Sequence, residues 1–312
     1  MTVRTHQVRP DPIDPLDPLD PLDPQGHPVY SDGLVDVVRV VGRPPRRTLR
    51  SVRTAHFDIR VEDGRVHITH WVPDERINSG LSEMLSHEVF GPGWLRGADV
   101  FERIMTGIVL TSREDPLEAW EHFYRSSLRE IEAAMQRADG PVEGTHGQIG
   151  GYAPVYARAE ELLVGRSVVE LGSCFGFFSL RQAETHEVTA VDVSVGSIRL
   201  LERMSARLGA PVENLVADAA HVALTDDAAD TVVALHLLEH LEAQHGRRVI
   251  AEAIRLARRR VIIAVPFEDE PEELWGHVRV LTMEDLRGYG RATGLPFEVH
   301  EHHGGWLVLD IA

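Results

Sequence analysis

The sequence has no lysine among its 32 basic residues, and it has a single cysteine, Cys174. One cysteine excludes an internal disulfide framework and a cysteine-based zinc site. Neither an apolar run of about 18 residues nor an N-terminal apolar segment is present, so the sequence predicts neither a membrane span nor a signal peptide. A net charge of −17 disfavours phosphate backbones and anionic lipids as partners. We therefore expect a cytoplasmic protein with a small-molecule partner and no nucleic acid or membrane.

The first 27 residues differ in composition from the rest of the chain. The run DPIDPLDPLDPLDP (11–24) places a proline at every third position. Proline lacks a backbone donor and pushes the preceding residue into an extended conformation, so neither helix nor sheet is expected here. The sequence predicts a disordered Asp-Pro-rich tail over 1–27, and a docking arm is the alternative.

Residues 28–145 combine strand and helix patterns. The segment HFDIRVEDGRVHITHWV predicts a hairpin around Asp63 and Gly64, because apolar and polar residues alternate on both sides of this pair. Residues 115–140 predict a helix that begins at Asp115 and ends at Gly140. We expect a small α+β region with a possible acceptor-binding or lid role. Packing in a core is the stronger explanation for its aromatic helix residues: Trp120, Phe123 and Tyr124.

Residues 146–312 alternate between short Val/Ile/Leu-rich runs and amphipathic segments, after a glycine-rich boundary at 139–151. Apolar strands joined by helices predict a parallel sheet covered on both faces, a doubly wound α/β fold. The last two apolar runs are separated by Gly304 and Gly305, which predicts an antiparallel strand at the end.

The stretch VVELGSCFGFFSL (168–180) predicts the first strand-to-helix turn, where such a sheet binds its ligand. Gly172 and Gly176 let the backbone turn and approach a ligand, but the dinucleotide pattern G-x-G-x-x-G is missing. Acidic residues end three successive predicted strands: Glu170, Asp192 and Asp218. A cationic nucleoside suits these carboxylates better than a pyrophosphate does. Helix capping is the alternative for any single acid, Asp218 in particular.

With its motifs VVELGSCFG, VTAVDVS, VADA and DTVVALHLLEHL, the region 150–312 resembles the class I S-adenosylmethionine-dependent methyltransferases. The resemblance implies a Rossmann-like sheet of seven strands with the last one antiparallel, and S-adenosylmethionine as the cofactor. Cys174 departs from the family pattern, which has a glycine at this position. The cofactor-binding residues that follow are Glu170, Gly172, Ser173, Cys174, Gly176, Asp192, Val193, Asp218, Ala219 and His236.

The N-terminal region, GQIGGYAPVY and LGSCFGF are similar to the actinobacterial methyltransferases that act on the mycofactocin oligosaccharide. This resemblance implies O-methylation of a sugar hydroxyl in a glycosylated metabolite. The alternatives are another small-molecule hydroxyl or amine, as in a quinone, lipid or natural product, and a non-catalytic protein that binds S-adenosylmethionine. The oligomeric state stays open.

A sugar hydroxyl is a weak nucleophile and needs a general base. HLLEHL supplies His236 and His240 after the fourth predicted strand, and GHVRV supplies His277 after the fifth. These three histidines are the catalytic candidates, with packing or capping as the alternative. HEHH (300–303) directs successive side chains to opposite faces of a strand, so we predict no metal site.

Overall fold

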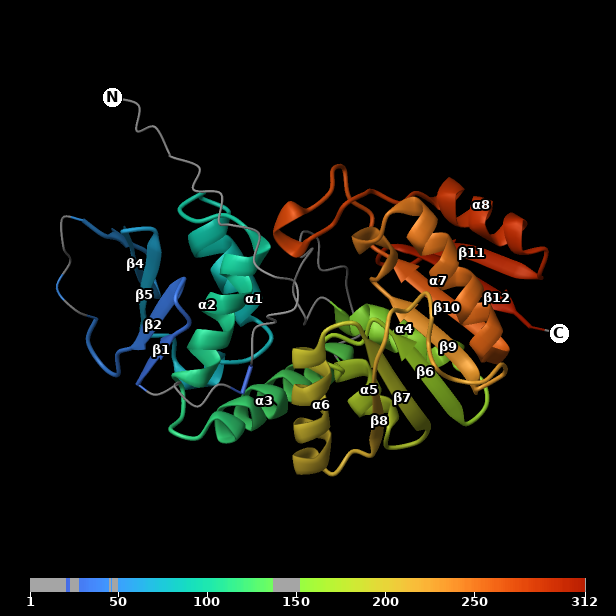
Figure 1. Cartoon of the computed structure of the whole chain (residues 1–312), viewed down its shortest axis with the longest axis horizontal. Coiled ribbons are helices and arrows are strands. Elements are labelled where there is room, and N and C mark those ends of the chain that lie inside the picture. The colour runs from blue at the N-terminus through green and yellow to red at the C-terminus, as the bar shows by residue number, and fades with distance from the viewer. Residues whose placement is uncertain (1–20, 23–27, 45, 47–49, 137–151, 312) are drawn as a thin grey trace.

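The computed structural model describes residues 21–22, 28–44, 46, 50–136 and 152–311. In this part of the chain a small sheet and a large sheet stand apart, with α1, α2 and α3 between them (Figure 1). The predicted boundary at 139–151 lies outside the described residues, as does the predicted tail apart from Pro21 and Leu22. Within these ranges, no helix has both the length and the apolar character needed to cross a bilayer.

The small sheet has five strands in the order β1-β2-β5-β4-β3. The predicted hairpin is confirmed, because β4 and β5 pair antiparallel and both turn residues, Asp63 and Gly64, have positive φ. Phe57 and Ile59 are buried as predicted, but Asp58 between them is buried too, and Val61 is 58% exposed at the hairpin end. The strands are β1 (Val29–Ser31), β2 (Val35–Arg39), β3 (Val52–Arg53), β4 (Phe57–Glu62) and β5 (Arg65–His70).

The helices that follow pack against this sheet and lead towards the large one. Helix α2 lies so close to β2 that a Cβ on Gly107 would stand 2.5 Å from Cγ2 of Val37. Helix α3 is capped as predicted, since the Asp115 carboxylate accepts the Glu118 N–H at 2.9 Å. The elements are η1 (Asp74–Arg76), α1 (Leu81–Leu85), the π-helical turn η2 (Ser86–Phe90), α2 (Ala98–Leu110) and α3 (Pro116–Gln136).

The large sheet has seven strands in the order β11-β12-β10-β9-β6-β7-β8. Strand β12 pairs antiparallel with both neighbours, while β10, β9, β6, β7 and β8 pair parallel to one another. The fold class predicted from the sequence is therefore confirmed, including the antiparallel last strand. The strands are β6 (Ser167–Leu171), β7 (Glu187–Asp192), β8 (Val212–Val216), β9 (Ala229–Leu235), β10 (Ala257–Val265), β11 (Phe297–Glu301) and β12 (Gly305–Asp310).

Helices cover both faces of the large sheet. The central strands are apolar without alternation, and neighbours such as Ile262 and Ile263 are both fully buried because each faces a different helical layer. One layer contains α4 (Ala153–Leu162), α5 (Phe177–Gln182) and α6 (Val195–Leu208), and the other contains α7 (Ala243–Leu256) and α8 (Met283–Thr293).

An aromatic cluster joins the N-terminal unit to the large sheet. Phe123 of α3 lies 5.7 Å from Phe175 between ring centroids, and Tyr124 lies 5.1 Å from Phe177. The indole N–H of Trp120 donates to the carbonyl of Pro21. The three α3 rings are at most 1% exposed, so the core-packing interpretation is confirmed for them. Burial of each such ring contributes roughly 1.5–3 kcal/mol to the free energy of folding. The rings pack against the turn after β6 and so support its conformation.

Candidate active site

The turn between β6 and α5 is fixed by hydrogen bonds to the end of β7. The N–H groups of Gly172 and Ser173 both donate to the carbonyl of Val191, at 2.9 and 3.0 Å. Gly172, Cys174 and Gly176 all have positive φ, which costs a glycine little and an ordinary residue more. The hydroxyl of Ser173 is buried and has no hydrogen-bond partner within the described residues. The turn thus presents an unsatisfied polar atom at the carboxyl edge of the sheet.

Asp192 lies where β7 ends and connects two segments. One carboxylate oxygen accepts the N–H of Cys174 and the other accepts the N–H of Ser194, both at 2.8 Å. Ser194 in turn caps α6, and the neighbouring Val193 is 73% exposed. Each carboxylate oxygen has a second lone pair, so Asp192 can accept further hydrogen bonds from a ligand's hydroxyl groups.

Glu170 points into the domain. Its carboxylate accepts both the N–H (3.1 Å) and the hydroxyl (2.5 Å) of Ser179 in α5, and the residue is 4% exposed. Burial raises the pKa of Glu170 to about 8, against the lowering effect of these bonds. Glu170 therefore anchors the first turn of α5, and its predicted direct contact with a ligand stays a prediction.

Asp218 lies two residues beyond β8 and holds a histidine that the sequence analysis missed. Its carboxylate accepts the Ala220 N–H and contacts Nε2 of His245 in α7, both at 2.8 Å. Burial raises the pKa of Asp218, but these two contacts outweigh it and lower the pKa overall. Asp218 and the adjacent Ala219 are thus brought to the same sheet edge as Asp192.

The first residue after β9 is His236, which adopts a positive φ of 53°. Its ring lies edge-on to Tyr152, with 4.8 Å between centroids, and its Nδ1 is 3.8 Å from a carboxylate oxygen of Glu239. Burial raises the pKa of Tyr152 above its usual range, so this phenol stays protonated. His236 thus follows β9 at this sheet edge, and Tyr152 packs against its ring.

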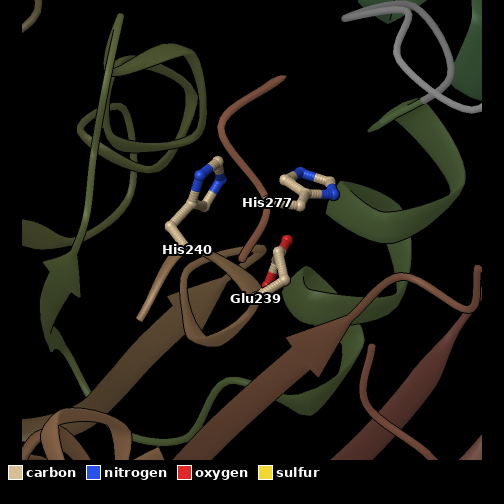
Figure 2. A group of neighbouring side chains, drawn as sticks. All are labelled: Glu239, His240 and His277. Atoms are coloured by element: carbon tan, nitrogen blue, oxygen red, sulfur yellow. The ribbon is translucent and has the colours of Figure 1, made fainter. Parts of the chain in front are cut away.

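Glu239, His240 and His277 form a cluster beside this edge, and Figure 2 shows their side chains gathered around one space. One ligand-type atom from each lies within 4.8 Å of the others. Glu239 and His240 belong to the short helix η4 (Leu238–His240), and the His277 ring meets the His240 ring edge-on at 4.7 Å. The structure thus brings together two of the three predicted catalytic histidines, and His236 contacts the same glutamate.

Hydrogen bonds from the two residues after His277 to the backbone of η4 fix the position of His277 in the loop after β10. The Val278 N–H donates to the carbonyl of Glu239 at 2.9 Å, and the Arg279 guanidinium donates to the carbonyl of Leu238 at 3.0 and 3.1 Å. The Nδ1 of His277 lies 2.9 Å from the carboxylate of Glu268, and both side chains are under 10% exposed. Glu268 was missed because PFEDEPEE offers several acids and no pattern that selects one.

Glu239 is the most unusual group in the cluster. It is 1% exposed, and neither carboxylate oxygen has a hydrogen-bond partner within the described residues. Burial raises its pKa to about 8. A buried carboxyl group without a hydrogen-bond partner destabilises a fold, and its position beside imidazole rings is typical of a functional site.

The HEHH histidines lie elsewhere. His300 in β11 stacks on Trp306 and accepts from Arg158 at 3.3 Å, while His302 and His303 lie in the turn before β12. Across the described ranges, the cluster of Glu239, His240 and His277 is the one place where three such side chains could share an ion.

The residues at the sheet edge fit a sulfonium nucleoside. The turn carries an unpartnered Ser173 hydroxyl, and the Asp192 and Asp218 carboxylates suit hydroxyl and amine donors. The edge carries no lysine or arginine among these predicted cofactor residues, and pyrophosphate would therefore be poorly held.

Comparisons with known proteins match part of the chain. Residues 168–260 match the family model described as "Methyltransferase domain". No curated protein matches the sequence. Similar solved structures include a SAM-dependent methyltransferase from Aquifex aeolicus, with 15% identity, 57% of this chain and 96% of that chain covered, and a TM-score of 0.43. Another is magnesium protoporphyrin IX methyltransferase from Synechocystis PCC 6803 with bound SAM, with 19% identity, coverages of 57% and 89%, and a TM-score of 0.40.

The matched residues 168–260 contain the turn after β6, Asp192, Asp218 and the η4 residues of the cluster. The chain therefore contains a methyltransferase domain, and it is a methyltransferase enzyme. Its cofactor is S-adenosylmethionine.

Proposed function

We propose that the enzyme transfers the methyl group of S-adenosylmethionine to a hydroxyl group of a saccharide-bearing small molecule, with the mycofactocin oligosaccharide as the acceptor. The observation that carries the hydroxyl assignment is the cluster of Glu239, His240 and His277 beside the cofactor edge. The saccharide and mycofactocin assignments rest on the sequence resemblance of the N-terminal region and the LGSCFGF turn.

Methyl transfer to oxygen makes a demand that transfer to an amine does not. An amine already offers a lone pair, whereas a sugar hydroxyl must lose its proton as the new bond forms. A buried carboxyl group and two imidazoles, of which His240 is exposed, lie beside the cofactor edge and supply groups for this activation. The remaining contribution is alignment of the acceptor with the methyl group, which is worth several kcal/mol.

We also propose that the N-terminal unit contributes to the acceptor site. The short helix η5 (Glu273–Trp275) precedes His277, and the Trp275 ring lies 4.9 Å from Phe101 of α2. The loop that carries His277 is thereby connected to the N-terminal unit. This contact supports an acceptor-binding role for residues 28–145.

The test incubates the purified enzyme with isotopically labelled S-adenosylmethionine and metabolite extract from cells that lack the gene. We expect label on one saccharide-bearing metabolite, and hydrolysis followed by NMR should locate it on a sugar oxygen. His240→Ala and His277→Ala should each reduce turnover at least tenfold, whereas His186→Gln, which lies before β7 at the opposite sheet edge, should not. Label on an amine, or on a hydroxyl outside any sugar, would overturn the proposal.

A further inference from the structure

The cluster of Glu239, His240 and His277 has the composition of a metal site. Two imidazoles and one carboxylate form a donor set that favours borderline divalent ions such as Zn²⁺ over Mg²⁺, which prefers oxygen ligands. We infer that these three side chains bind one divalent transition-metal ion of the Zn²⁺ type. Sequence analysis predicted no metal here, because His277 is far from Glu239 along the chain and only the fold brings them together.

The geometry of the cluster is close to that of an occupied site. Ligand atoms on a tetrahedral zinc ion with bonds of 2.0–2.1 Å lie about 3.3 Å apart, and here they lie within 4.8 Å of one another. Glu239 and His277 are buried and held by their surroundings, whereas His240 is exposed and can rotate. A small movement of His240 therefore closes the site.

Glu268 supplies the outer support that metal-binding histidines usually have. Its carboxylate lies 2.9 Å from Nδ1 of His277, so this ring nitrogen donates outward and Nε2 is the free ligand atom. The Nδ1 atom of His240 faces Gly276. It lies 3.8 Å from the position that a Cβ atom on Gly276 would occupy. Both rings thus have one nitrogen directed away from the shared space.

Glu239 provides an independent reason to expect a cation. Its carboxylate is 1% exposed and without hydrogen-bond partners in the described residues, and Glu268 adds a second acid nearby. A buried carboxyl group that lacks a hydrogen-bond partner is costly to keep in a fold, and coordination to a cation would satisfy its oxygens.

Three protein ligands leave the fourth position of a tetrahedral ion open, as in catalytic zinc sites. The role assigned to that position rests on the proposed function. An acceptor hydroxyl placed there would have a lowered pKa, and its proton would pass to water as the O–H bond breaks. The oxygen then forms a bond to the methyl carbon while the carbon–sulfur bond breaks, and sulfur keeps the electron pair as a neutral thioether.

The test measures binding of Zn²⁺ and Co²⁺ to the full chain, prepared without an affinity tag and stripped with a chelator. We expect one ion per chain by calorimetry, and absorption bands of tetrahedral Co²⁺. Glu239→Gln, which preserves shape, and His277→Ala should each lose binding, and Glu268→Gln should weaken it about 10- to 100-fold. His303→Gln, in the turn before β12, is the matched control and should bind like the wild type.

The wild type binding no ion, or Glu239→Gln and His277→Ala both binding normally, would overturn the site. Circular dichroism of each variant separates lost ligands from lost folding. Failure of this inference is distinct from failure of the proposed function. Saccharide methylation by a wild type that binds no ion would retain the proposed function and reject the metal site. One bound ion without saccharide methylation would retain the metal site and reject the proposed function.

Discussion

The carboxylate of Asp192 accepts the backbone N–H of Cys174 at 2.8 Å and so joins the end of β7 to the turn after β6. One side chain thereby shapes the turn and presents lone pairs to the cofactor edge. Asp192→Asn removes the charge and replaces one acceptor with a donor. We expect at least tenfold weaker binding of S-adenosylhomocysteine by calorimetry, with about 1 kcal/mol of lost stability. Asp226→Asn, at an exposed position, should bind normally, and equal affinities for both variants would contradict this role.

Gly176, which precedes α5, and Gly209, which ends α6, are a matched pair for substitution by alanine. Their φ values are 70° and 72°, so alanine is similarly strained at both, by about 1–2 kcal/mol. A Cβ at Gly176 would stand 2.4 Å from Leu201, whereas nothing lies within 4 Å at Gly209. Gly176→Ala should therefore cost about 1–3 kcal/mol more than Gly209→Ala in denaturant unfolding. Equal losses would show that the contact with Leu201 relaxes freely.

Acid sensitivity is predicted from His70, which is fully buried in β5 and contacts the Thr111 hydroxyl at 2.9 Å. Burial, with the nearby Arg39, lowers its pKa to about 3. The unfolded chain takes up a proton near pH 6.5 while the folded chain does not. The stability associated with neutral His70 is thus complete above pH 6.5 and declines by about 1.4 kcal/mol per unit as the pH falls towards 3.

Urea unfolding of the wild type and of His70→Gln at pH 7 and pH 5 tests this contribution, because the other titrating groups are common to both proteins. The wild type should lose about 2 kcal/mol more than the variant between the two pH values. Identical losses would show that His70 titrates normally in the fold.

Phe123 should couple the N-terminal unit to cofactor binding. It is fully buried and contacts Phe175 in the turn after β6. Phe123→Ala should cost about 3–5 kcal/mol of stability and also weaken S-adenosylhomocysteine binding at temperatures where the protein remains folded. Tyr30→Ala, in the small sheet and away from the turn, serves as the control. Unchanged affinity of Phe123→Ala for S-adenosylhomocysteine would show that cofactor binding does not depend on the packing of Phe123 against the turn.

Local patterns in the sequence were sufficient to predict the sheet. Buried runs such as that of β10, the Asp63–Gly64 turn and the Asp115 cap are short-range signals, and each is found in the structure. The site depends on contacts between distant segments. Nothing in GHVRV indicates that the Val278 N–H bonds to Glu239, and the strand-end position of Glu170 did not reveal that it turns inward to Ser179.

The histidines illustrate the same limit. His240 and His277 were candidates because both follow strands that end at one sheet edge, which is a topological argument. The partner of His277 is Glu268, and its selection among neighbouring acids depends on the path of the loop after β10. Side-chain direction in loops is set by packing, which a single sequence does not encode locally.

The central claim is that the carboxyl edge of the large sheet binds S-adenosylmethionine. Hydrogen exchange of the full chain, with and without S-adenosylhomocysteine, measures this directly. The account predicts slower exchange in peptides that contain the turn after β6, the end of β7 and the residues around Asp218, and unchanged exchange in β1 to β5. Protection confined to the small sheet, or no protection at a saturating ligand concentration, would contradict it.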